Sequence, residues 1–332
     1  MSKKKILLAA PNSFNIYQPI VKNLEFWGYE VTHIEDHGYG FKYSSLGQRL
    51  RSFFKKVVFN DKEYKTKLKV RYNYTRQSKI IADAAPFDIA LVFRADFFDR
   101  ELVKEIQASA EQSISFHFDG VGRDPVILDY VQYFDRFYVF DKEDLVKYPS
   151  YGLLYSPNFY FDYPEKSDPE TVYDVYYVSS FQTSRVDHLL SLYKQLVGYY
   201  SKVKFVVIPG RVNEEDIPEF IHQNMEIQSH HVSFEEQLAY VRNAKVIIDL
   251  VLSDHNGYSF RIIEGIKYGK KVITTNATVV DADFYHPNNF FIWTLETADK
   301  LADFLETPYH PLPAEVRSKY GFSAWLEAKL LD

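Results

Sequence analysis

The residues best suited to chemistry lie in a polar loop that leads into an expected helix near Phe260. Gly257 and Ser259 stand where that helix begins, and the N–H groups at a helix N-terminus favour a phosphate. Arg261 in the first turn could supply charge-assisted hydrogen bonds to a diphosphate. Glu264, one turn further on, could accept hydrogen bonds from both hydroxyls of a ribose. The spacing therefore predicts a nucleotide diphosphate site, although it also suits an i,i+3 ion pair on the surface.

A second group of residues could take the proton from a hydroxyl that acts as a nucleophile. Asp119 is the first candidate base, because it follows an expected strand at 113–118 and precedes a glycine. His117 is the second candidate, and strand alternation would place it on the same face as Asp119, so that one could orient the other. Asp96 is a weaker alternative. A packed core imidazole and a turn cap are the competing interpretations of His117 and Asp119.

Two patterns suggest metal ligands, and we interpret neither as a metal site. The adjacent residues His230 and His231 would point to opposite sides of a strand. Asp281 and Asp283 form an Asp-x-Asp pattern, which we interpret as loop acids. The chain has no cysteine, so thiolate ligands and thiolate nucleophiles are excluded. We therefore expect no metal.

The elements that must position these residues form two series of alternating strand-like and helix-like runs. The expected strands are 4–10, 29–34, 87–93, 113–118 and 136–140 in the first series, and 173–178, 203–208, 245–250, 271–275 and 289–293 in the second. Such alternation is typical of parallel sheets with helices on both faces. A chain of 332 residues is long enough for two domains. We predict an α/β fold of two Rossmann-like doubly wound domains facing across a cleft, with ligands beyond the carboxyl ends of the strands.

Several segments carry a resemblance to a known family. In the second half, the patterns are Arg261-Ile-Ile-Glu264, Lys271-Val-Ile-Thr-Thr-Asn276 and Phe284-Tyr285. Upstream are Tyr133-Phe-Asp-Arg-Phe-Tyr-Val-Phe-Asp141 and the strand Tyr173-Asp-Val-Tyr-Tyr-Val-Ser-Ser180, followed by Arg185. Together they resemble GT-B glycosyltransferases, and more narrowly the bacterial lipopolysaccharide-core and capsular polysaccharide glycosyltransferases. In that family a Glu at the start of a helix in the C-terminal domain binds the ribose of the donor.

The resemblance implies how the chain is divided and which residues bind the donor. Residues 1–160 would be the acceptor-binding domain, 161–310 the nucleotide-sugar-binding domain, and 311–332 a closing helix that could pack back on the N-terminal domain. The implied donor-binding residues are Ser180, Arg185, Asn256, Gly257, Tyr258, Ser259, Arg261 and Glu264. The candidate catalytic residues are Asp119 and His117, chosen above for their position at the end of an expected strand. No cofactor is expected beyond the nucleotide-sugar co-substrate.

One position departs from the pattern of many retaining GT-B enzymes, which have two glutamates eight positions apart. The residue eight positions before Glu264 is Asn256. An amide can hydrogen-bond a sugar hydroxyl but cannot act as an anion. The sequence therefore leaves the anomeric outcome open.

The expected function is transfer of a sugar from a nucleotide-sugar to a cell-surface glycan, such as lipopolysaccharide, capsule or a glycolipid. The alternative is a non-catalytic two-domain protein that binds a sugar or a nucleotide. A dinucleotide-dependent oxidoreductase or epimerase would need a Gly-x-Gly-x-x-Gly turn after the first strand. The segment from Ala10 to Asn15 contains no glycine, which argues against that class.

Charge indicates the remaining partners. The formal net charge of −6 argues against nucleic-acid binding. The segment from Lys42 to Lys79 nevertheless carries +10, and its cations alternate with aromatic residues such as Phe53 and Phe54. That pattern suits the headgroup level of an anionic membrane, although a solvated helical face would show it too. The sequence has no apolar run of about 18 residues, so we expect a cytoplasmic protein that could lie on the inner face of the cell membrane.

Overall fold

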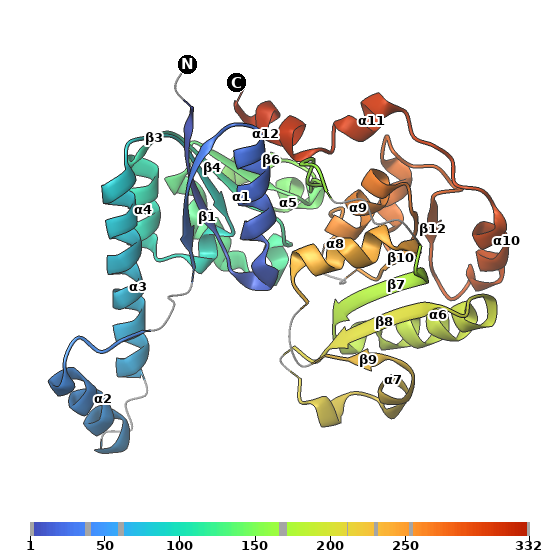
Figure 1. Cartoon of the computed structure of the whole chain (residues 1–332), viewed down its shortest axis with the longest axis horizontal. Coiled ribbons are helices and arrows are strands. Elements are labelled where there is room, and N and C mark those ends of the chain that lie inside the picture. Colours follow the sequence, from blue (N-terminus) through green and yellow to red (C-terminus); the bar gives the residue numbers. More distant parts are fainter. Residues whose placement is uncertain are drawn as a thin grey trace. The chain divides into compact units, whose positions relative to one another are not determined.

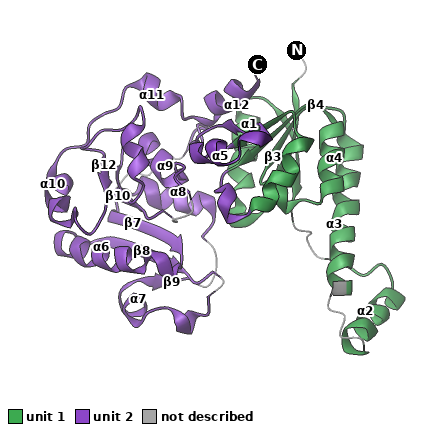
Figure 2. Ribbon diagram, turned by 180° about the vertical axis from the view of Figure 1, so that it is seen from behind, with its two compact units in different colours: residues 1–117, 125–138 green, residues 118–124, 139–332 purple. Residues whose placement is uncertain are grey.

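The computed structural model describes residues 3–36, 41–58, 63–165, 171–210, 212–228, 232–251 and 255–330. The chain forms two compact units, shown in Figure 2. The first is Met1–His117 with Pro125–Tyr138, and the second is Phe118–Asp124 with Val139–Asp332. The domain limits at residues 160 and 310 stay predictions.

The N-terminal sheet has six strands in the order β2-β1-β3-β4-β5-β6. The strands are β1 (Lys5–Ala10), β2 (Glu30–Glu35), β3 (Phe87–Phe93), β4 (Ala110–His117), β5 (Arg136–Val139) and β6 (Leu154–Tyr155). β1 lies parallel to β2 and β3, with Leu7 opposite Thr32 and Ala90. Every residue from Ile6 to Ala10 is fully buried, as a central parallel strand covered on both faces requires.

The basic segment of this unit forms two helices, α2 (Leu46–Val58) and α3 (Glu63–Ala84). The C-terminal half of α3 lies beside α4 (Arg100–Ala108), whereas its first turns and α2 extend beyond the sheet (Figure 1). The remaining helix of this unit is α1 (Tyr17–Phe26), which ends before Gly28 at a left-handed φ of 88°. None of the described helices combines the length and low charge needed to span a lipid bilayer.

The C-terminal sheet has the strand order β12-β11-β10-β7-β8-β9. Its strands are β7 (Tyr173–Ser180), β8 (Val203–Ile208), β9 (Glu226–Ile227), β10 (Ala244–Asp249), β11 (Lys271–Thr274) and β12 (Phe290–Ile292). Counted within this half, the order is that of a Rossmann fold, and the chain reverses direction across the sheet between β7 and β10. These two strands are parallel neighbours, with Val246 opposite Val175. The predicted pair of doubly wound parallel sheets is confirmed.

The helices of the second unit cover both faces of this sheet. On one face, α6 (Val186–Tyr199) and α10 (Leu301–Glu306) pack with Val175 and Tyr177 into one core cluster. On the other face, α8 (Phe234–Arg242) packs on Tyr176, while α9 (Phe260–Tyr268) packs on Val272. Period-two alternation along β7 therefore supplies both cores. The second unit also contains the short helices α5 (Lys142–Lys147) and α7 (Glu219–Asn224).

The closing segment predicted as one helix within 311–332 forms two helices, α11 (Ala314–Ser318) and α12 (Phe322–Leu330). The break occurs at Gly321, which bridges Tyr160, and the Phe322 N–H donates to the Tyr160 carbonyl at 2.9 Å. The ring of Trp325 on α12 lies 4.7 Å from that of Phe159. At Gly321, backbone pairing with Tyr160 therefore takes the place of continuous helical hydrogen bonding.

Candidate functional site

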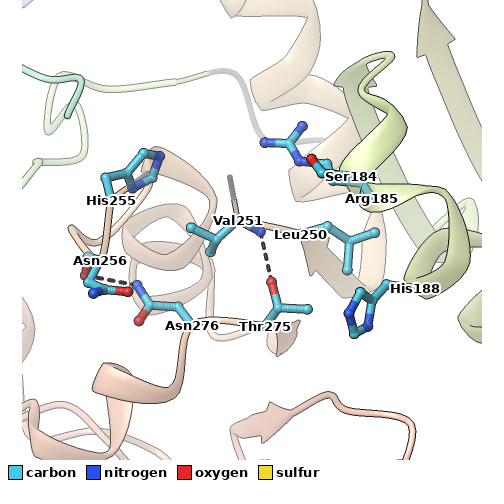
Figure 3. A pocket seen from close by; sticks show the side chains of 9 residues that line it. All are labelled: Ser184, Arg185, His188, Leu250, Val251, His255, Asn256, Thr275 and Asn276. Carbon is cyan, nitrogen blue, oxygen red and sulfur yellow. Dashed lines mark hydrogen bonds between the residues drawn. The ribbon is translucent and has the colours of Figure 1, made fainter. Parts of the chain in front are cut away.

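The C-terminal sheet has a pocket of about 230 Å³ at the ends of β7, β10 and β11 (Figure 3). This is the point where the strand order reverses, and open α/β sheets bind ligands there, beyond the carboxyl ends of the strands. The lining residues are Ser184, Arg185, His188, Leu250, Val251, His255, Asn256, Thr275 and Asn276. The pocket brings together three separate segments of the chain, 184–188, 250–256 and 275–276.

One wall follows β7. Arg185 ends a short 3-10 helix (Thr183–Arg185) that leads into α6, and its Nη1 donates a hydrogen bond to Ser179 Oγ. Its Nε is buried and has no hydrogen-bond partner among the described residues, and the same holds for Nδ1 of His188 one turn later. Buried polar atoms are normally hydrogen-bonded, so these two point to a ligand that the pocket would hold.

The opposite wall comes from the loops after β10 and β11. The Val251 N–H donates to Thr275 Oγ1 at 2.9 Å, which ties the two loops together. His255 lies across the pocket from Arg185 (Figure 3), and its Nδ1 is the third buried polar atom of the lining without a partner in the described part of the chain. A cation and two imidazoles around one small cavity suit an anionic or hydroxyl-rich ligand.

Asn256 and Gly257 are fixed by the protein. The Asn256 N–H donates to Asp141 Oδ2 at 2.7 Å, and its side-chain amide donates to Glu143 Oε1 at 2.5 Å. A Cβ on Gly257 would lie 2.5 Å from the ring of Phe140. The absence of a side chain at Gly257 therefore lets the backbone approach an aromatic ring.

Ser259 is the N-cap of α9, as its position predicts. Its Oγ accepts from the Ile262 N–H and donates to Asp249 Oδ1 at 2.7 Å. Thr274 Oγ1 donates to the other oxygen of the same carboxylate at 2.9 Å. Asp249 therefore joins the end of β10 to the start of α9 and to β11.

Arg261 and Glu264 form an i,i+3 ion pair of 2.5 Å, and Arg261 also donates to the side chain of Gln237. The alternative interpretation placed this pair on the surface. In the structure the Glu264 side chain is 1% exposed and the Arg261 side chain 16% exposed, because α9 packs against α8 and the sheet. Burial raises the pKa of Glu264, and the charge of Arg261 opposes that shift. Glu264 Oε1 has no hydrogen-bond partner among the described residues, which leaves one carboxylate oxygen able to accept a bond.

The remaining predicted donor-binding residues lie around this pocket rather than in it. Tyr258 belongs to an apolar cluster, where its ring lies 5.3 Å from that of Phe284. Ser180 is the last residue of β7 and approaches Gly210, which has a left-handed φ of 68°. Of the predicted set, Arg185 and Asn256 line the pocket.

The two candidate bases lie at the end of β4. The strand ends at His117, so the alternation that would place Asp119 on the same face as His117 does not extend that far. His117 is fully buried, and its Nδ1 lies 3.9 Å from Asp96 Oδ1, while Arg94 binds Asp96 through two hydrogen bonds. Asp119 pairs with Arg123 at 2.9 Å and accepts from the Gly120 N–H. The role of either residue as a base stays a prediction.

The sequence analysis interpreted neither the Asp-x-Asp pattern nor the histidine pair as a metal site. Asp283 accepts from Lys319 Nζ at 2.8 Å and from the Tyr320 hydroxyl at 2.6 Å. Asp281 ends a 3-10 helix at Ala277–Asp281, and His230 and His231 lie outside the described residues. Within the described ranges, no group of three or more His, Asp or Glu side chains is placed to hold a metal ion. Metal independence stays a prediction.

Sequence reasoning did not select several residues of the pocket. His188 and His255 carry no motif of their own. Thr275 and Asn276 belong to the pattern Lys271-Val-Ile-Thr-Thr-Asn276, on which the family resemblance partly rests. Their position directly after β11 could have identified them as pocket residues. A search for polar residues directly after each expected strand of the C-terminal half would have found Thr275 and Asn276.

No protein-family model matches the sequence, and no curated protein matches it significantly. Solved structures do share its fold. An α,α-trehalose-phosphate synthase (UDP-forming) from Burkholderia vietnamiensis has a TM-score of 0.57 at 12% identity, covering 100% of this chain and 96% of that one. A lipopolysaccharide outer core galactosyltransferase in its apo form has a TM-score of 0.51 at 11% identity over 98% of both chains. A UDP-GlcNAc 2-epimerase from Methanocaldococcus jannaschii, in complex with UDP-GlcNAc and UDP, has a TM-score of 0.51 at 11% identity over 99% of both chains.

The chain therefore has the GT-B fold, as the resemblance predicts. The missing glycine motif after β1 argues against dinucleotide-dependent epimerases only. A UDP-GlcNAc 2-epimerase shares the GT-B fold, so epimerase activity of that kind is left to be tested.

Proposed function

We propose that this protein is a glycosyltransferase that moves a sugar from a nucleotide-sugar donor to an acceptor hydroxyl. The observation that carries the proposal is the pocket at the strand reversal of a Rossmann-type sheet, where Arg185, His188 and His255 each have a buried polar atom without a partner in the described part of the chain. Nucleotides bind at this place in open α/β sheets. The GT-B fold supports sugar transfer as the use of such a site.

In this proposal Arg185 neutralises the diphosphate, and no metal or other cofactor is needed. Charge-assisted hydrogen bonds from a guanidinium suit phosphate oxygens. Glu264 Oε1 accepts a hydrogen bond from the donor ribose after a small movement of α9 or of the loop before it. Asp119 or His117 acts as the base that takes the acceptor proton. The anomeric outcome stays open, because Asn256 stands where many retaining GT-B enzymes have a second glutamate.

The proposed acceptor is a cell-surface glycan, such as lipopolysaccharide, capsule or a glycolipid. The resemblance supports this choice, and one protein of the same fold is a lipopolysaccharide outer core galactosyltransferase. An acceptor on a lipid anchor would be met at the cytoplasmic face of a membrane. The basic segment at 42–79 suits an anionic membrane surface as a second partner.

A thermal shift screen with UDP, GDP, TDP, CMP and ADP tests the proposal. A ligand that binds only the folded protein stabilises it by mass action, so the matching nucleotide must raise the melting temperature, and a tighter-binding nucleotide must raise it further. If none of the five does so at millimolar concentration, the donor site is wrong.

Product analysis with the matching nucleotide-sugar then separates the possible activities. Transfer, with slow hydrolysis to the free nucleotide when no acceptor is present, is expected for a transferase. Binding without turnover in the presence of acceptor glycans would indicate the non-catalytic alternative. Interconversion of nucleotide-sugars would indicate an epimerase.

A further inference from the structure

The N-terminal unit has a second polar pocket, formed between α2 and the first turns of α3. Its volume is about 540 Å³, and four cations line it: Arg49, Lys56, Lys65 and Lys69. None of its described lining residues is acidic. No carboxylate of the described residues forms an ion pair with any of the four.

The position of α2 explains why its cations converge on the pocket. Ser52 is the buried residue of α2, and it accepts a hydrogen bond from the Tyr43 hydroxyl at 3.2 Å. Arg49 and Lys56 stand three and four residues from Ser52, so helical spacing places them on the same side. Lys65 and Lys69 share one side of α3 for the same reason. Both helices therefore present a cationic side to one cavity.

The apolar side of α2 does not face the protein. Its large apolar residues are 56% to 79% exposed, although they recur at helical spacing as in a core-facing helix: Leu46, Leu50, Phe53, Phe54, Val57 and Val58. A water-soluble helix normally buries such a stripe. Here the polar side packs inward and the apolar stripe faces outward, and Phe53 belongs to both the stripe and the pocket lining.

We propose that this part of the protein binds the phosphate of an anionic phospholipid, with the apolar stripe of α2 inserted between the lipids and the four-cation pocket around the headgroup. Charge complementarity explains the pocket, and membrane insertion explains the exposed stripe beside it. A free phosphate would account for the cations alone, and a nucleic acid would leave the apolar stripe in water. The inference does not depend on glycosyl transfer.

Sedimentation with three kinds of phosphatidylcholine vesicle tests the proposal: neutral vesicles, vesicles containing phosphatidylglycerol, and vesicles brought to the same surface charge with oleate. Binding is expected to be strongest with phosphatidylglycerol. Equal binding to the oleate vesicles would mean that charge alone is recognised and would overturn the headgroup site. Equal binding to neutral vesicles would overturn it as well.

Two matched double variants of α3 separate a pocket from general electrostatics. Lys65→Gln/Lys69→Gln removes two pocket cations, whereas Lys67→Gln/Arg71→Gln removes two exposed cations with the same i,i+4 spacing that do not line the pocket. At roughly 1 kcal/mol for each cation near an anionic surface, the pocket variant should bind about 30-fold more weakly. The control variant should change less than about 5-fold, and an equal loss in both would contradict the proposal.

Two further measurements assign the occupant. Leu50→Ser/Phe54→Ser should abolish vesicle binding while circular dichroism and nucleotide binding stay unchanged, because both side chains are already exposed. A stable dimer in sedimentation velocity that this variant dissociates would assign the stripe to a second copy of the chain. Inorganic pyrophosphate that stabilises the protein through Lys65 and Lys69 without any vesicle binding would assign the pocket to a soluble ligand. Either the dimer or the pyrophosphate result would overturn the lipid assignment.

Discussion

Arg261 and Glu264, one turn apart on α9, form an ion pair in which the Glu264 side chain is only 1% exposed. Their spacing is that of an ordinary surface pair, and only the packing of α9 decides that the pair is buried. The Arg261 guanidinium is shared between Glu264 and Gln237 of α8, so the pair also joins two helices.

Glu264→Ala should lower the free energy of unfolding by about 3 kcal/mol, because it removes the buried carboxylate that neutralises the largely covered guanidinium of Arg261. Chemical denaturation measures the change. The matched control is Glu101→Ala, which breaks an exposed i,i+3 pair of 2.7 Å with Lys104 and should cost less than about 1 kcal/mol. Similar small changes in both variants would contradict the buried pair.

Arg185→Gln should weaken nucleotide binding about 10- to 100-fold, since a hydrogen bond to a charged group contributes about 1.5–3 kcal/mol. Titration calorimetry with the nucleotide that the thermal shift screen identifies measures the loss. Arg317→Gln removes an exposed arginine on α11 of the same unit and should leave the affinity unchanged. Equal affinities for wild type and Arg185→Gln would remove Arg185 from the donor site.

Gly257→Ala should destabilise the protein by about 1–3 kcal/mol, because the new methyl group would overlap the ring of Phe140. Nothing lies within 4 Å of a Cβ at Gly198 in α6, so Gly198→Ala is the control and should be neutral or stabilising. Adding Phe140→Leu should recover part of the loss at Gly257. If it recovers none, the close approach to Phe140 is not the cause.

Lys329 on α12 should make stability depend on pH. Its Nζ is buried, donates to Ser156 Oγ at 2.7 Å, and burial lowers its pKa to about 6. An unfolded lysine stays protonated to a pKa of about 10.4, so between pH 6 and 10 the unfolded chain binds more protons than the folded chain. The free energy of unfolding therefore rises with pH across that window.

Lys329→Met removes this contribution. The variant should be more stable than wild type by on the order of a few kcal/mol near pH 6, and by less near pH 9. Urea denaturation at both pH values measures the difference, with Lys300→Met as an exposed control that should show no such trend. A constant difference between variant and wild type would show that Lys329 is protonated in the folded protein.

Dialysis against a chelator should leave transferase activity unchanged, because the proposal assigns the diphosphate charge to Arg185 and Asp283 is engaged by Lys319 and Tyr320. Turnover of the matching nucleotide-sugar before and after dialysis is the measurement. Complete loss of activity that manganese restores would establish a metal requirement.

Much of the fold was predictable because it depends on local pattern. The predicted strands 87–93 and 203–208 and the helix starting at Phe260 agree with β3, β8 and α9. Short elements such as α7 and β9 were missed, since six and two residues carry too little periodicity to be recognised. The break at Gly321 was missed because its cause is a backbone contact with Tyr160, which is far away in the sequence.

The sequence by itself determined two halves of alternating strands and helices, a basic segment, and a cap at Ser259, because helix and strand periods and capping depend on neighbouring residues. The tertiary structure alone decided that Arg185 and His255 line one pocket, that Glu264 is buried, and that α2 exposes its apolar side. These facts follow from strand order and helix packing. Both depend on contacts between residues distant in the chain, and local sequence patterns do not specify such contacts.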